Sequence, residues 1–222
     1  MTDSQPCHWA MWDEQTKAIR RMSTAEVFAP ERAYGWEFYQ RPTVEVAWGL
    51  LGAVLVKREP EGLCAARLVE LEAYLPDGDA ANHAARGWSE RTAPMFAAGG
   101  ILYVYAIYGR HRCVNVVTEP EGRPGAVLLR AAEVLHGEEL MRRRRGEVQW
   151  EALCRGPANL ARAFGFELSD NFRSVCSAEL FIVPPPEPIA PEAVRRTPRI
   201  GISRARELPL RFVLWQSRCR SR

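Results

Sequence analysis

The sequence predicts a single α+β domain, and three observations support this. A chain of 222 residues is long enough for one domain with a substantial core. Its 47% hydrophobic and 26% charged residues are typical of a globular protein, which excludes a disordered or fibrous chain. The sequence contains both strand-like and helical segments, with no internal repeat and no clear linker. No apolar run approaches about 18 residues and no apolar leader follows Met1, so we expect neither a membrane span nor a secretory signal.

The first part of the chain predicts a tail and then a structured domain. Residues 1–35 are polar and show no sustained apolar period, so we expect a loosely ordered N-terminal tail with one short helix over 13–21. The domain itself is expected over residues 36–222. Its first helix is expected between Thr43, a candidate N-cap, and Gly52, a glycine suited to the C-terminal end of a helix.

Strands and short helices fill the rest of the domain. Residues 54–57 and 63–74 flank a turn at 59–62, which predicts a hairpin. Residues 75–93 form a long polar loop, and such loops in compact domains are usually functional or disordered. The other expected strands cover 101–108, 111–118, 126–132, 180–183, 199–202 and 210–215. Two more helices are expected over 136–145 and 156–166. A proline-rich extended connector is expected over 184–191.

Two carboxylates and a tyrosine share one face of the long strand. Side chains alternate along a strand, so Glu70, Glu72 and Tyr74 point to the same side. Either this face is solvated, or it carries a general acid or base pair beside a stacking platform. The two carboxylates would lie about 7 Å apart, but neighbours on one strand flank a sugar poorly, which disfavours a two-carboxylate glycosidase.

Three tyrosines are candidates for contacts with a planar ligand. Tyr103 and Tyr105 share a strand face, and Tyr108 precedes Gly109 at a predicted hairpin tip. An aromatic side chain at a tip either folds back onto the core or acts as a wedge between stacked bases.

Polar residues in or near strands are further candidates. His83 lies in the polar loop, Asn115 lies within a strand and Arg130 ends an apolar run, so each either lines a polar cavity or faces solvent. Arginine dominates the 30 basic residues, because only Lys17 and Lys57 are lysines. This bias fits phosphate binding, and it also fits a GC-rich genome. The cysteines and histidines show no metal spacing, so we expect reduced thiols and no structural metal.

A series of segments forms a specific pattern through its order and spacing. These are VAWGLLG at 46–52, VELEAY at 69–74, His83, MF at 95–96, LYVYAIYGRHRCVN at 102–115, VLLRA at 127–131, GPANLARAFGF at 156–166 and PLRFVL at 209–214. Together they resemble the 3-methyladenine DNA glycosylase family of the alkyladenine (methylpurine) type. The resemblance runs from about Phe38 to Val213, which is nearly the whole domain.

The resemblance implies a fold and an activity. The fold would be a curved antiparallel β-sheet core with surrounding helices, like the C-terminal domain of formyltransferases. The activity would be that of a monofunctional DNA N-glycosylase, which flips alkylated or deaminated purines such as 3-methyladenine out of duplex DNA. It would hydrolyse the N-glycosidic bond to start base excision repair, without a cofactor or metal. The expected partner is double-stranded DNA containing damaged purines, and we expect a cytoplasmic, nucleoid-associated monomer.

The resemblance also implies roles for individual residues. Glu72 resembles the general base that activates water, and Arg130 resembles the residue that orients the water and the carboxylate. A non-catalytic damage-binding module on the same scaffold is the alternative, but such a module has no need of this pair. Tyr108 resembles the wedge that fills the vacated duplex. The implied base-pocket residues are Tyr74, His83, Tyr105, Leu128 and Asn115, the last of which disfavours guanine, and the implied backbone contacts are Arg91, Arg110 and Arg142.

Overall fold

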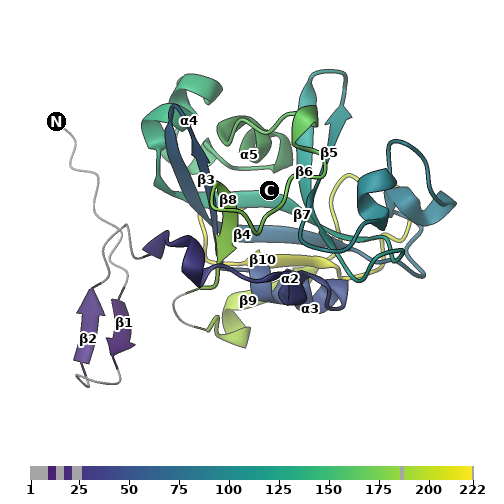
Figure 1. Cartoon of the computed structure of the whole chain (residues 1–222), viewed down its shortest axis with the longest axis horizontal. Helices are drawn as coiled ribbons and strands as arrows, with labels where there is room; N and C mark the ends of the chain where they lie inside the picture. The colour runs from purple at the N-terminus through teal and green to yellow at the C-terminus, as the bar shows by residue number, and fades with distance from the viewer. Residues whose placement is uncertain (1–9, 14–17, 22–26, 186–187, 222) are drawn as a thin grey trace.

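An antiparallel sheet that curls around a hydrophobic core forms the centre of the protein (Figure 1). The computed structural model describes residues 10–13, 18–21, 27–185 and 188–221. Within these residues the sheet has eight strands, with the order β5-β6-β7-β4-β10-β9 and with β3 paired to both β4 and β8. A mixed α+β domain with a curved antiparallel sheet is therefore confirmed.

The two longest strands lie next to each other at the centre of the sheet. They are β4 (Gly62–Tyr74) and β7 (Gly125–His136). The shorter strands of the sheet are β3 (Val54–Glu59), β5 (Leu102–Ile107), β6 (His111–Thr118), β8 (Leu180–Val183), β9 (Val194–Thr197) and β10 (Arg211–Leu214). A separate ribbon pairs β1 (Ala10–Asp13) with β2 (Ala18–Arg21).

Short helices flank the strands. In Figure 1, α4 (Glu138–Arg145) and α5 (Pro157–Ala163) lie above the central strands, and α2 (Trp36–Tyr39) and α3 (Thr43–Leu50) lie below them. No helix in the described residues is long and apolar enough to cross a membrane. Short 3₁₀ turns cover Pro30–Arg32, His83–Arg86, Ala93–Phe96, Trp150–Ala152, Leu168–Asp170 and Pro191–Ala193.

Strand β4 positions the site because it is hydrogen-bonded along both edges. β7 pairs with one edge, and β3 and β10 share the other. The register places Glu72 opposite Leu128 of β7 and opposite Arg211 of β10. The ladder between β4 and β7 shifts register between Leu68 and Glu70, which is a typical place for a β-bulge to re-aim side chains beside a site.

Several sequence expectations differ from the structure near the ends of the chain. The helix expected over 13–21 is wrong, because β1 and β2 contribute extended residues there and 14–17 lie outside the described residues. Much of the expected N-terminal tail also lies outside them. The described part already packs before Trp36, since Val27 and Phe28 are buried. The expected N-cap at Thr43 is wrong as well, because Pro42 occupies that position and the helix begins at Thr43.

Two further boundaries were shifted by long-range contacts. The strand expected at 199–202 is wrong, because β9 ends at Thr197 and Arg199 turns away to a buried ion pair with Asp79. The helix expected over 136–145 begins only at Glu138, since β7 continues to His136.

The beginning of α3 depends on a side chain from the turn between β6 and β7. The Thr43 N–H donates to Oε1 of Glu119 at 2.7 Å, and the Thr43 hydroxyl donates to the same oxygen at 2.9 Å. This carboxylate therefore satisfies a helix N-terminal donor that the Pro42 side chain cannot satisfy.

We expect Glu119→Ala to lower the free energy of unfolding by about 1–3 kcal/mol, because it leaves the buried N–H of Thr43 without its acceptor. Urea denaturation measures this change. Glu121→Ala removes an exposed carboxylate from the same turn and is expected to change stability by less than about 0.5 kcal/mol. Equal effects of the two substitutions would contradict the capping role of Glu119.

Candidate active site

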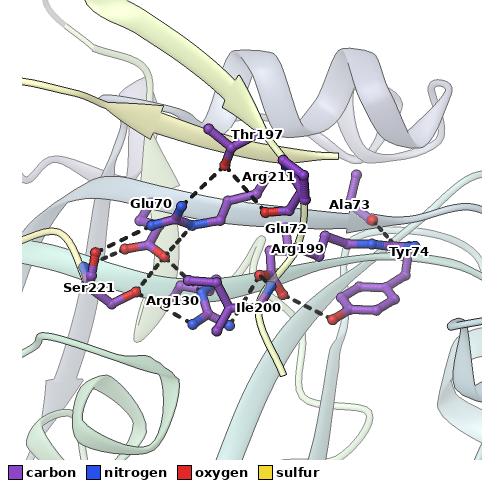
Figure 2. Close-up of polar contacts among 11 residues, drawn as sticks. Glu70, Glu72, Ala73, Tyr74, Arg130, Thr197, Arg199, Ile200, Arg211 and Ser221 are labelled. Atoms are coloured by element: carbon purple, nitrogen blue, oxygen red, sulfur yellow. Dashed lines mark hydrogen bonds and ion pairs between the residues drawn. The ribbon is translucent and has the colours of Figure 1, made fainter. Parts of the chain in front are cut away.

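The carboxylates of β4 are buried, and two arginines from neighbouring strands face them (Figure 2). Glu70 and Glu72 each have no exposed surface. Arg130 comes from β7 and Arg211 from β10, the strands on either side of β4. Glu70, Glu72 and Tyr74 do share one face, as the alternation predicts, but the solvated interpretation of that face is wrong.

Glu70 is the more heavily bonded carboxylate. Its Oε1 accepts hydrogen bonds from Arg130 Nε at 2.8 Å, from Arg211 Nε at 2.8 Å and from Ser221 Oγ at 2.6 Å. Its Oε2 accepts from Ser221 N at 2.6 Å. Burial alone would raise the pKa of Glu70, but the hydrogen bonds from Arg211 and Ser221 and the charge of Arg130 hold it below the usual value. Glu70 is therefore an ionised structural carboxylate.

Glu72 lies between a guanidinium and a phenol. Its Oε1 accepts from Ile200 N at 2.7 Å and lies 3.2 Å from Arg130 Nη1. Its Oε2 accepts from the Tyr74 hydroxyl at 2.9 Å. Burial and the adjacent Glu72 charge raise the pKa of Tyr74, so the phenol keeps its proton and remains the donor. Oε1 of Glu72 is thus held by Ile200 and Arg130, and Oε2 faces Tyr74.

Arg130 joins the two carboxylates. Its Nε contacts Glu70 and its Nη1 contacts Glu72, so one guanidinium spans both side chains. Burial lowers the pKa of Arg130, but the charges of Glu72 and Glu70 raise it above the usual value. The guanidinium therefore stays charged and fixes the orientation of Glu72.

Arg199 supports Tyr74 from behind. Its guanidinium carbon lies 4.5 Å from the Tyr74 ring centroid, which is a cation–π distance. The same group donates to Ala73 O at 2.8 Å and to Asp79 Oδ1 at 2.7 Å. Both side chains of this ion pair are fully buried, so Arg199 fixes one face of Tyr74 and leaves the other for a ligand.

A narrow aromatic slot opens beside Tyr74. Its cavity volume is about 20 Å³. A slot of this size holds about one water molecule. Its lining residues are Tyr74, His83, Met95, Tyr103, Tyr105, Asn115 and Ala126.

The histidine and two tyrosines of the slot form one connected cluster. The His83 Nδ1 lies 3.0 Å from the Tyr103 hydroxyl, and the His83 ring meets Tyr105 edge-on at 4.6 Å between centroids. Tyr103 and Tyr105 stack with their centroids 5.4 Å apart. Burial and the charge of Arg91 lower the pKa of His83, so its imidazole is neutral at neutral pH.

Asn115 lines the slot, whereas Leu128 is buried beside it on the same face of the sheet. Asn115 is buried, and its Nδ2 donates to Tyr103 O at 3.0 Å, which orients the amide. Leu128 is paired with Asn115 and with Glu72 in the register, and it does not line the slot.

Tyr108 lies at the tip of the β5–β6 hairpin and is 91% exposed. It adopts a left-handed conformation with φ 48°, which is costly for a non-glycine residue. The interpretation that it folds back onto the core is therefore wrong.

The three arginines expected at the DNA backbone occupy different environments. The Arg91 guanidinium lies 5.7 Å from the Tyr105 ring centroid, and Arg110 is exposed beside the hairpin tip. Arg142 instead bonds to Glu138 of its own helix and to Val148 O. The structure therefore brings Arg91 and Arg110 near the slot and the tip, while Arg142 is engaged within the protein.

Some site residues carried no sequence signal of their role. These are Arg199, Ser221 and the backbone N–H of Ile200, which reach the site from the C-terminal part of the chain. Arg211 lies in the PLRFVL segment, but nothing in that segment indicated its contact with Glu70. Among the described residues, no group of three histidine, cysteine or acidic side chains could hold a metal ion.

Comparisons with known proteins show which family the chain resembles. The methylpurine-DNA glycosylase (MPG) family matches residues 37–218. A "Putative 3-methyladenine DNA glycosylase" of Chlorobaculum parvum is 46% identical over 178 residues, covering 80% of this chain and 85% of that protein. A protein of the same name from Methanoculleus marisnigri is 47% identical over 187 residues, covering 83% and 96%. With a family match over most of its length and relatives of this similarity, the chain belongs to the methylpurine-DNA glycosylase family of DNA N-glycosyl hydrolases.

Proposed function

We propose that this protein is a monofunctional glycosylase that removes alkylated purines such as 3-methyladenine, and also deaminated purines, from double-stranded DNA. One observation carries the proposal. A buried carboxylate, Glu72, is held by Arg130 on one side and hydrogen-bonded to Tyr74, a wall of the aromatic slot, on the other. A module that only bound DNA would gain nothing from a carboxylate held in this position, because DNA is itself an anion.

Extrusion of the damaged base is the first step of the proposed mechanism. A purine inside a duplex is out of reach, so it must leave the stack at a cost of a few kcal/mol. Tyr108 is exposed at a hairpin tip and would fill the space that the base vacates. The slot is narrower than a purine, so its walls must separate when the base enters.

Stacking would hold the extruded base in the slot. Tyr74 offers one face and the cluster of His83 and Tyr105 offers the opposing surface. A purine alkylated at a ring nitrogen is cationic, and cation–π attraction contributes about 0.5–2 kcal/mol. The neutral imidazole of His83 adds no repulsive charge. The Asn115 amide lines the slot and is oriented by its bond to Tyr103 O, and its Nδ2 group would disfavour guanine, whose exocyclic amino group is also a donor.

Hydrolysis follows from the position of Glu72. The carboxylate accepts a proton from a water molecule, whose oxygen bonds to C1′ of the deoxyribose. The bond between C1′ and the base nitrogen breaks, and its electron pair leaves with the base. Alkylation makes the base a better leaving group because its positive charge is neutralised in this step. Arg130 contacts Glu72 Oε1 and orients the carboxylate for this step.

We expect Glu72→Gln to lower the single-turnover excision rate at least roughly a hundredfold, because glutamine keeps the shape but cannot accept the proton. Affinity for lesion DNA should stay equal or increase, since a negative charge is removed near phosphate. Quenched single-turnover cleavage and gel-shift titration on one 3-methyladenine or hypoxanthine duplex measure both quantities.

Glu70→Gln is the matched control on the same strand face. We expect a smaller loss of excision, because Glu70 reaches the reacting atoms only through Arg130. If Glu72→Gln cleaves normally and Glu70→Gln does not, the base has been assigned to the wrong residue. If the unaltered protein cleaves none of a panel of alkylated and deaminated purines, the proposal fails in favour of a damage-binding module.

We expect Tyr108→Ala to weaken binding to lesion duplex and to slow excision from it, because the vacated space is no longer filled. The folded state should be unaffected, since Tyr108 is almost fully exposed. Trp48→Ala removes another exposed aromatic side chain, on α3 and far from the hairpin in Figure 1, and serves as the control. An unchanged rate of duplex excision in Tyr108→Ala would exclude the wedge role.

We expect no covalent adduct with DNA when the reaction is trapped with borohydride, because a lyase needs a free amine. Lys57 is the only lysine in the matched part of the chain, and its Nζ is buried against Phe164 O, Gly165 O and Glu59. The product should be an intact abasic site, which alkali then cleaves. A trapped side-chain or N-terminal adduct would overturn the monofunctional assignment.

A further inference from the structure

The last described residues fold back across the carboxylate face of the sheet. Ser217 Oγ donates to Glu133 Oε1 at 2.7 Å, and Arg155 Nη2 donates to Arg218 O at 2.7 Å. Cys219, which lies between Arg218 and Ser221 in the sequence, is buried. The segment therefore carries Ser221 onto the middle of β4, where it faces Glu70 (Figure 2).

Ser221 supplies half of the hydrogen bonds that Glu70 accepts. Its hydroxyl bonds to Oε1 and its backbone N–H bonds to Oε2, both at 2.6 Å. Because both oxygens are engaged from the same residue, the carboxylate is fixed in rotation as well as in position. Glu70 is in turn the group that holds Arg130 Nε.

The hydroxyl of Ser221 also contacts Arg130 directly. Arg130 Nη2 lies 3.4 Å from Ser221 Oγ, Arg130 Nε contacts Glu70, and Arg130 Nη1 lies 3.2 Å from Glu72. One hydroxyl therefore donates to the anchoring carboxylate and accepts from the guanidinium. Ser221 does not line the aromatic slot, so any effect on the reaction passes through this network.

We propose that Ser221 is a positioning residue for excision, which sets the place of Arg130 at Glu72 through Glu70. The inference rests on the proposed function of Glu72. Without the hydroxyl, Glu70 keeps its ion pairs with Arg130 and Arg211 but loses the hydrogen bond from Ser221 Oγ. Arg130 Nη2 then loses its contact with the same hydroxyl. The guanidinium then samples positions in which Nη1 leaves Glu72.

Ser217 provides a matched control in the same segment. Its hydroxyl also donates to a carboxylate, Glu133, and it accepts from Cys219 N at 3.2 Å. Glu133 pairs with Arg67 and is not bonded to Arg130 in the described residues. Ser217→Ala and Ser221→Ala should therefore loosen the segment to a similar extent and lower thermal stability similarly, while only Ser221→Ala disturbs Arg130.

The kinetic experiment compares single-turnover excision by the full-length variants on one lesion duplex. We expect Ser221→Ala to lower the rate about tenfold, with unchanged duplex affinity. Ser217→Ala should excise at nearly the wild-type rate, and Ser221→Thr, which keeps the hydroxyl, should recover most of the rate. Excision by Ser221→Ala at the wild-type rate, or an equal loss in Ser217→Ala, would overturn the inference.

A second measurement is independent of activity. The Nε–Hε resonance of Arg130 can be assigned from its absence in Arg130→Lys and then compared among the variants by NMR. We expect it to shift or broaden in Ser221→Ala and to stay unchanged in Ser217→Ala. If wild-type protein excises no damaged purine while this shift occurs, the proposed function fails and the positioning of Arg130 stands. An Arg130 signal that is unchanged in Ser221→Ala would exclude the positioning role.

Discussion

The site depends on charge compensation between two buried carboxylates and two buried arginines. Moving an ionised carboxylate out of water costs several kcal/mol, and a partner must offset most of that cost. Glu70 and Glu72 have no exposed surface, and Arg130 and Arg211 provide the compensating charges from the strands on either side of β4. The sheet must therefore keep β7, β4 and β10 in one register, because a shift by one residue would turn these side chains to the opposite face.

The two glutamates share a strand face but have different surroundings. Glu70 accepts four hydrogen bonds and has no oxygen directed to the slot, so it acts as a fixed anion for the arginines. Glu72 is bonded to Tyr74 on its aromatic side and to Arg130 on the other. This asymmetry makes Glu72 the candidate base, and it makes Glu70 the group through which the C-terminal segment acts on the chemistry.

The aromatic slot combines rigid support with a narrow opening. Arg199 lies against one face of Tyr74 and is itself held by Asp79, so this wall is fixed from behind. The opposing cluster of His83 and Tyr105 comes from the 3₁₀ turn His83–Arg86 and from the edge strand β5. Because the slot holds only about one water molecule, a purine can enter only if these two walls separate.

The sequence by itself determined the local features of this protein. Alternation placed Glu70, Glu72 and Tyr74 on one face, and a tyrosine before a glycine predicted the hairpin tip, at which the structure exposes Tyr108. Only the tertiary structure showed the different surroundings of Glu70 and Glu72, turned Arg199 out of its expected strand and brought Ser221 to Glu70, 151 residues away along the chain. The physical reason is that strand periodicity and turn geometry depend on neighbouring residues, whereas burial and ion pairing depend on which distant segments the sheet brings together.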